Sequence, residues 1–212
     1  FDNHYLFIAI SGIAILSMFV GNILAIKQKN IKRLLGYSSI ANMGYLMIIL
    51  LTGSNRGIQA SIFYLTSYIF TTIGAFGVIS LLSTNEYEAE KIEDFKGLFW
   101  KRPWIAIVFT LSLLSLAGIP VTAGFIAKFY IIFEGMKAGL MVLVFSMIIN
   151  SVIGLYYYLR IITMLFSAPG DNNLPELAIS GNITLAIVGI SILILGIYPG
   201  WLIDIIVRLV NL

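Results

Sequence analysis

Six long apolar stretches constrain the fold of this chain of 212 residues more than any other feature. They span 5–26, 34–52, 58–82, 104–133, 138–166 and 182–198. Each is near or above the roughly 20 residues that a helix needs to cross about 30 Å of hydrocarbon. A soluble core could not bury them, because 59% of the residues are hydrophobic and only 11% are charged. The pattern predicts an all-α, polytopic transmembrane helix bundle with six spans.

The cations indicate which helix ends face the cytoplasm, because Lys and Arg near helix ends favour that side. Nine of the thirteen lie in or beside the first, third and fifth loops: Lys27, Lys29, Lys32, Arg33, Lys91, Lys96, Lys101, Arg102 and Arg160. Arg56, Lys137 and Arg208 lie on the opposite side. We therefore expect both ends of this chain outside the cytoplasm, with lipid and not nucleic acid as the partner.

Most soluble chemistries are not expected here. The sequence has no cysteine and a single histidine, His4, so it offers no thiolate ligands and no imidazole cluster. The acidic stretch 86–94 is interpreted as a solvated loop without a metal or catalytic role. The first residues show neither a Met nor a basic leader, so we expect no signal peptide and a longer polypeptide.

The fourth stretch is predicted to be a broken helix. Its thirty residues would form a straight helix about 45 Å long, more than the hydrocarbon thickness. Pro120 removes a backbone donor and clashes with the preceding turn, and Gly118 and Gly124 lie on either side of it. Broken helices at membrane depth are tolerated where the freed backbone lines a polar cavity. We expect an unwound segment over 118–123.

Lys128 is the strongest candidate for a proton-handling group. An ammonium at lipid depth costs several kcal/mol unless water, a partner charge or deprotonation relieves it, so such groups are usually functional. We expect it about 9 Å inside a helix that ends near Glu134. The alternative is a lysine that extends its stem to the outer interface.

Other intramembrane polar groups are candidates for a water path. Tyr64, Tyr68 and Thr72 are four residues apart and share one helix face, and Asn150 lies at the middle of the fifth stretch. Their side chains can hold waters between charged sites. Simple helix packing with satisfied hydrogen bonds is the alternative.

Three further patterns are interpreted structurally. The tyrosines at 156–158, with Arg160, are typical of an interfacial belt. Small residues at Gly36, Ser38, Ser39, Ala41 and Gly44 indicate a helix face in close contact with a neighbour. In the tail, Asp204 and Arg208 share one face of an amphipathic turn that we expect along the membrane interface.

Several runs resemble the antiporter-like membrane subunits of respiratory complex I. The first run covers 21–45 and includes Asn30-Ile31-Lys32-Arg33 and Gly36-Tyr37-Ser38-Ser39. The runs at 97–103, 116–130 and 154–160 narrow the resemblance to the subunit N family of the bacterial NADH:quinone oxidoreductase. Sister subunits carry histidines and a lysine in the third stretch, or a glutamate in place of Lys128.

The resemblance implies a subunit of fourteen helices with two inverted five-helix repeats. Residues 1–168 would form the second repeat, and 169–212 a loop, the final helix and an interfacial tail. Lys128 would be the lysine of the second broken helix, which exchanges protons toward the positive side. Lys32 would lie near the cytoplasmic input.

The resemblance also implies a non-redox subunit of a proton-pumping enzyme in the bacterial plasma membrane. NADH, FMN, iron-sulfur clusters and quinone would be bound by other subunits, and the partners would be other membrane subunits of the complex. Two alternatives remain: a cation/proton antiporter or membrane-hydrogenase subunit, and a structural scaffold anchored by Lys128.

Overall fold

The computed structural model describes residues 4–83, 88–168 and 179–210. These residues form α-helices and one 3-10 turn. The elements are α1 (His4–Ile26), α2 (Ile31–Thr52), α3 (Asn55–Leu82), the 3-10 turn η1 (Ile92–Phe95), α4 (Leu98–Lys101), α5 (Pro103–Ala117), α6 (Ala123–Lys137), α7 (Met141–Phe166), α8 (Ile179–Ile197) and α9 (Gly200–Val210). The all-helical prediction is confirmed for this part of the chain.

The number of spans is confirmed only in part. Four described helices, α1, α2, α3 and α7, are each long and apolar enough to cross a membrane. The pair α8 and α9 passes the same test together but bends by 80° between its helices, which would make a fifth. Each half of the broken stretch, α5 and α6, has only 15 residues, and neither reaches spanning length alone.

Local sequence signals begin and end these helices. Asn30 caps α2 by accepting a hydrogen bond from the backbone N–H of Arg33 at 3.0 Å, and Ser54 caps α3 through Gly57 N–H at 2.9 Å. Gly53 ends α2 in the left-handed region at φ 59°. The N–H of Ile31 donates to the carbonyl of Glu90, which ties the loop after α3 to the start of α2.

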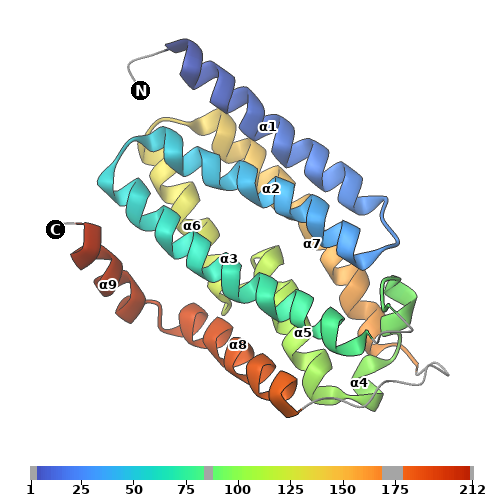
Figure 1. Ribbon diagram of the computed structural model, residues 1–212. Helices are drawn as coiled ribbons and strands as arrows, with labels where there is room; N and C mark the ends of the chain where they lie inside the picture. The colour runs from blue at the N-terminus through green and yellow to red at the C-terminus, as the bar shows by residue number, and fades with distance from the viewer. Residues whose placement is uncertain (1–3, 84–87, 169–178, 211–212) are drawn as a thin grey trace.

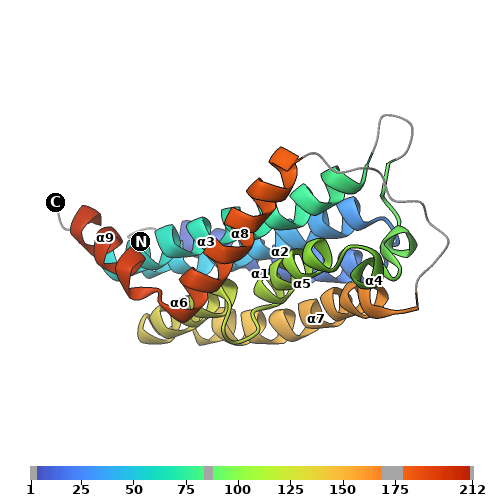
Figure 2. The same cartoon turned by 90° about the horizontal axis from the view of Figure 1, so that it is seen from below.

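The helices pack around two apolar clusters. Figure 1 shows α1, α2 and α3 side by side, and Figure 2 shows α7 and α8 on opposite faces of the bundle. One cluster gathers around Phe95, Phe109 and Leu113 near the end where α4 lies. The other surrounds Met18, Ile48 and Phe63 near the end where α2 gives way to α3.

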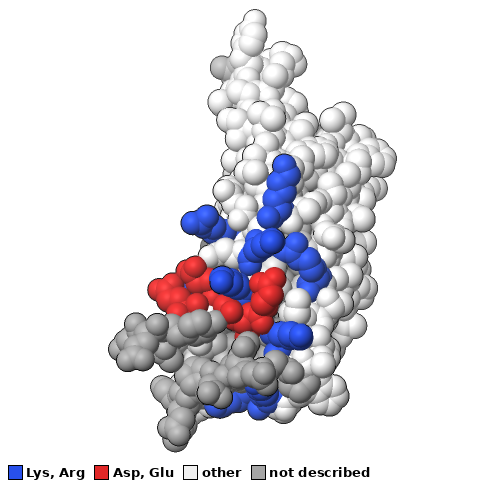
Figure 3. Space-filling view, turned by 90° about the vertical axis from the view of Figure 1, so that its right-hand side faces the viewer, with Lys and Arg blue, Asp and Glu red and all other residues white. Residues whose placement is uncertain are grey.

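The basic surface lies at one end of the bundle. Figure 3 faces the side that is on the right in Figure 1, and there Lys and Arg side chains surround an acidic group. This end contains the start of α2 and α4, and the charge bias predicts that it faces the cytoplasm. We call the opposite end, where α2 meets α3 and α6 meets α7, the outer end.

The prediction that small residues of α2 pack closely against a neighbouring helix is correct at Gly44 and wrong at Gly36. A Cβ at Gly44 would lie 2.7 Å from Met18 Cγ and 2.8 Å from the carbonyl of Ala14, so α1 and α2 approach closely there. Gly36 has open space around it. The contact with α1 therefore runs through Gly44 and Ala41 and does not include Gly36.

Candidate functional site

The break between α5 and α6 covers residues 118–122, one residue shorter than predicted. Gly118 ends α5 at φ 83°, and Val121 lies at φ 75°, a region that β-branched residues rarely adopt. Ser115 Oγ accepts a hydrogen bond of 3.0 Å from Gly124 N–H and thereby joins the two half-helices. Pro120 is exposed in the middle of the break. The backbone here is interrupted and strained.

Lys128 reaches back from α6 to the end of α5. Its Nζ donates to the carbonyl oxygens of Leu116 at 2.9 Å and Ala117 at 3.0 Å, and to Ser151 Oγ on α7 at 3.0 Å. The last carbonyls of a helix have no partner within the helix, so the break supplies two of these acceptors. Three acceptors match the three donors of an ammonium group.

The surroundings of Lys128 are polar but carry no anion. The residue is 8% exposed, and the Tyr45 ring centroid lies 5.4 Å from Nζ. Among the described residues no carboxylate forms an ion pair with it. The negative end of the α5 dipole and the tyrosine ring both favour a positive charge at Nζ, while burial opposes it. Among the described residues, neutral oxygens and the Tyr45 ring stabilise the charge of the amine, and no carboxylate does.

This placement decides between the two alternatives for Lys128 and corrects one distance. The side chain does not extend toward the outer interface, because Nζ bonds to two carbonyls at the end of α5 and to Ser151 on α7. Helix α6 continues to Lys137, so Lys128 lies about 13 Å from its end and not 9 Å. Gly118 permits the close approach, since a Cβ there would lie 2.8 Å from Lys128 Cδ.

The hydroxyl stripe of α3 faces α2. Tyr64 donates to Asn42 Oδ1 at 2.9 Å, and Tyr68 donates to Ser39 Oγ at 2.7 Å. Thr72 Oγ1 is buried without a partner among the described residues. A crevice of about 10 Å³, enough for about one water, lies between Lys128 and the side chains of Asn42, Tyr64, Ser67, Tyr68 and Thr71.

Asn150 does not line this crevice. Its Oδ1 accepts from Asn22 Nδ2 at 3.0 Å, and Tyr157 OH donates to Asn22 Oδ1 at 2.8 Å. These bonds join α1 and α7. Nearby, the hydroxyls of Tyr158 and Ser38 share a hydrogen bond that joins α7 to α2.

The predicted tyrosine belt is therefore wrong for two of its three members. Tyr157 and Tyr158 are buried, and only Tyr156 is exposed. Arg160 donates to the carbonyls of Ile26 and Gln28, at the end of α1. The sequence signal that could have revealed this is the presence of Asn22 and Ser38 in apolar stretches, since buried polar groups require partners.

Lys32 lies apart from the break, on the basic end. Its Nζ is 2.8 Å from Glu88 and 3.4 Å from Glu90, in the loop before η1. The hydrogen bond from Lys32 lowers the pKa of the Glu88 carboxyl. Sequence reasoning missed this pairing, because the bridge between the loop and α2 connects residues about sixty positions apart.

The described residues contain no group of three His, Cys, Asp or Glu side chains that could hold a metal ion. The chemistry available at the break is therefore that of a buried amine with neutral acceptors.

Comparisons with known proteins identify the family. The model of the NADH:quinone oxidoreductase/Mrp antiporter transmembrane family matches residues 2–154. NADH-quinone oxidoreductase subunit N of Ectopseudomonas mendocina is 43% identical over 201 residues, which are 92% of this chain and 41% of that protein. The chain thus spans less than half the length of this relative.

Solved structures show the same fold. A chain of respiratory complex I from Thermus thermophilus with bound aureothin matches with a TM-score of 0.85 and 34% identity, over 92% of this chain and 44% of that one. A chain of the Mrp complex from Dietzia sp. matches with a TM-score of 0.85 at 18% identity, over 97% of this chain and 46% of that one, which shows the fold alone. The chain belongs to the NADH:quinone oxidoreductase and Mrp antiporter family of transmembrane subunits.

Proposed function

We propose that this protein carries protons across the membrane as a non-redox subunit of NADH:quinone oxidoreductase, with Lys128 as the relay. The observation that carries the proposal is the amine of Lys128, buried at a helix break and held by three neutral oxygens. Ser151 Oγ can accept a hydrogen bond from the ammonium or donate one to the lone pair of the neutral amine, whereas a carboxylate partner would strongly favour the charged amine. Such an amine can gain and lose a proton as its surroundings change.

A neighbouring charge changes the affinity of the Lys128 amine for its proton. Lys128 keeps its proton when a titratable neighbour along the membrane is neutral, and releases it when that neighbour becomes charged, since like charges repel strongly in a low dielectric. The described residues provide no such partner within ion-pair or hydrogen-bond distance, so the partner belongs to another part of the protein or to another subunit. The strained backbone at Val121 lets the break move with the proton.

The proton path uses the remaining polar groups. Helices α5 and α6 together cross the membrane as one broken span, which gives six spans in all and makes residues 1–168 the second five-helix repeat. The crevice by Tyr64 and Tyr68 admits water next to Lys128. Lys32 marks the cytoplasmic input at the basic end.

The redox chemistry takes place elsewhere in the complex. Iron-sulfur clusters are held by cysteine thiolates, and this sequence has no cysteine. NADH, FMN, the clusters and quinone are bound by other subunits, which this subunit contacts within the bacterial plasma membrane. The coupling therefore reaches Lys128 through charge and conformation.

The test is Lys128→Met in the full-length protein within the assembled complex. NADH-driven proton transport into membrane vesicles and quinone reduction should both fall several-fold, because Met keeps the apolar stem and removes the amine. Lys137→Met, on the exposed end of the same helix, is the matched control and should leave both rates near those of the unmodified complex. Normal pumping by the Lys128→Met complex would show that the relay assignment is wrong.

A second candidate, monovalent-cation/proton antiport, is supported by the match of residues 2–154 to a family that includes Mrp antiporter subunits. Carbonyl oxygens at the end of a broken helix also suit sodium. Sodium-driven proton exchange in vesicles without NADH, lost in Lys128→Met, would support antiport over redox-driven pumping.

A further inference from the structure

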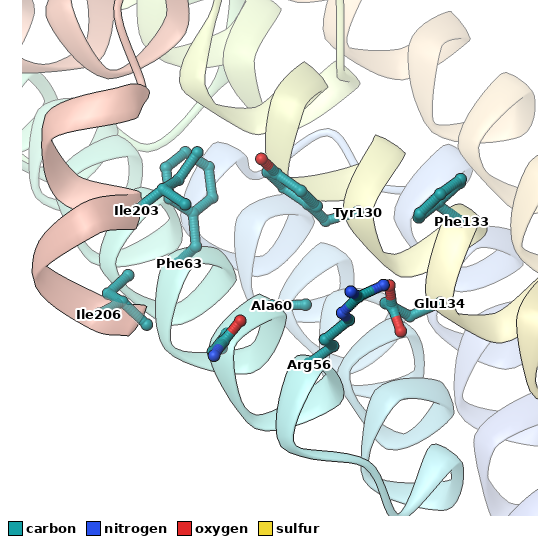
Figure 4. A pocket seen from close by; sticks show the side chains of 9 residues that line it. Arg56, Ala60, Phe63, Tyr130, Phe133, Glu134, Ile203 and Ile206 are labelled. Carbon is teal, nitrogen blue, oxygen red and sulfur yellow. The ribbon is translucent and has the colours of Figure 1, made fainter. Parts of the chain in front are cut away.

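A cavity at the outer end of the bundle is separate from the break. It lies between α3, α6 and α9 and has a volume of about 240 Å³ (Figure 4). This is far more space than a single ion or a single water requires. Its apolar walls are Ala60, Phe63, Phe133, Ile203 and Ile206, and its polar groups are Arg56, Gln59, Tyr130 and Glu134.

The cavity presents one positive and one negative side chain. Figure 4 shows the Arg56 guanidinium and the Glu134 carboxylate directed toward one another, yet no ion pair joins them within the described residues. Glu134 is 8% exposed, and a buried carboxylate is costly unless it is paired. Lys137 Nζ forms an ion pair with Glu134 at 3.8 Å, which is too long for a hydrogen bond, and lies 4.1 Å from the Phe133 ring centroid. Both charged groups in the cavity therefore keep unused hydrogen-bonding capacity.

The cavity lies at the helix ends, where we expect the lipid headgroups of the bilayer. Arg56 is in the first turn of α3, and Glu134 is in the last turn of α6, both at the outer end. Helix α9 bends by 80° from α8, and it is amphipathic, as expected for a helix in the interface plane. Its Ile203 and Ile206 side chains form the apolar side of the cavity. A ligand from the bilayer can therefore enter with its polar end outward.

We propose that this cavity binds the headgroup of a phospholipid with a primary amine, such as phosphatidylethanolamine. The phosphate binds the Arg56 guanidinium, whose planar donors match phosphate oxygens. The ammonium binds Glu134, and the start of an acyl chain lies against Phe63 and Ile206. An anionic lipid without the amine would bring its phosphate close to the Glu134 carboxylate and leave that carboxylate with only its long ion pair to Lys137.

The size of the cavity agrees with this occupant. At about 240 Å³ it is smaller than the roughly 300–1,000 Å³ of pockets that enclose whole drug-sized ligands. It fits a headgroup and the adjoining part of one chain, while the rest of the lipid lies over exposed apolar side chains such as Phe133. The proposal does not depend on the role of Lys128.

The test uses the intact purified complex after partial delipidation, with thermal unfolding of this subunit followed as phosphatidylethanolamine or phosphatidylglycerol is added. Phosphatidylethanolamine should stabilise this subunit at a lower concentration than phosphatidylglycerol does. Glu134→Gln should raise about tenfold the phosphatidylethanolamine concentration that gives half of the full stabilisation, because one charge-assisted hydrogen bond is lost. The preference for phosphatidylethanolamine over phosphatidylglycerol should disappear in this variant. Arg56→Gln should weaken the response to both lipids. Arg208→Gln, on α9 outside the cavity, is the matched control and should change neither.

Two results would overturn the proposal: equal or stronger stabilisation by phosphatidylglycerol in the unmodified complex, or an undiminished preference in Glu134→Gln. A second measurement does not need variants. Phosphatidylethanolamine carrying a photoreactive group near the start of its acyl chain should crosslink to peptides containing Phe63 or Ile203. Crosslinks to this subunit that all lie away from the cavity would also overturn it.

Discussion

The hydrogen bonds between Asn22, Asn150 and Tyr157 allow a quantitative prediction. Asn22→Ala removes two bonds between α1 and α7, of 3.0 Å to Asn150 and 2.8 Å from Tyr157. Side-chain hydrogen bonds within membrane proteins contribute about 0.6 kcal/mol on average and at most about 1.7. Two such bonds give about 1–3 kcal/mol. We therefore expect Asn22→Ala to destabilise the full-length protein by that amount.

The assay is thermal or denaturant unfolding of the protein in its complex, arranged as a double-mutant cycle with Asn150→Ala. The cycle isolates the bond between the two amides, and we expect a coupling energy of about 0.5–2 kcal/mol. Ser146→Ala is the control, because its hydroxyl donates to the Val142 carbonyl in its own helix and to no other helix among the described residues. Additive effects of the two asparagine variants would refute the reasoning, since the structure places Asn150 directly on Asn22.

The remaining predictions concern the α1–α2 contact and the two lysines. Gly44→Leu should lower the free energy of unfolding by at least about 1–3 kcal/mol, because the new Cβ would collide with Met18. Gly36→Leu should change the free energy of unfolding and the thermal midpoint little, because the space there is open. Equal effects of the two variants would contradict the assigned contact. Lys128→Arg should assemble but pump more slowly than the unmodified complex in vesicles, because guanidinium does not release its proton; full activity would argue against proton exchange at this position. Lys32→Gln should slow pumping less than Lys128→Met does, and unchanged rates in Lys32→Gln would exclude an input role.

The helices and the break follow from local sequence. The length of each apolar stretch determines where a helix forms. Asn30 and Ser54 determine where two of the helices begin, and Gly118 with Pro120 determines where the broken helix is interrupted. In each case the physical cause lies within a few residues of the feature. Predicted and observed helix ends accordingly differ by only a few residues.

The internal contacts of the site do not follow in the same way. The belt interpretation of Tyr157 failed because the same residue type suits both an interface and a buried hydrogen bond, and its partner Asn22 is 135 positions away. The pairing of Lys32 with Glu88 likewise spans 56 positions. The acceptors of Lys128 at Leu116 and Ala117 could have been predicted from the sequence. A break at Gly118 must leave the last carbonyls of α5 without helical partners.

The most direct measurement of the central claim is chemical rescue of Lys128→Ala. The shortened side chain leaves the carbonyls of Leu116 and Ala117 and the Ser151 hydroxyl around a space that propylammonium would fill. If Lys128 exchanges a proton, as we propose, propylammonium should restore part of the NADH-driven membrane potential in vesicles. Tetramethylammonium, which has no proton to exchange, should not. A normal potential in Lys128→Ala without any amine, or equal rescue by tetramethylammonium, would contradict a proton relay at Lys128.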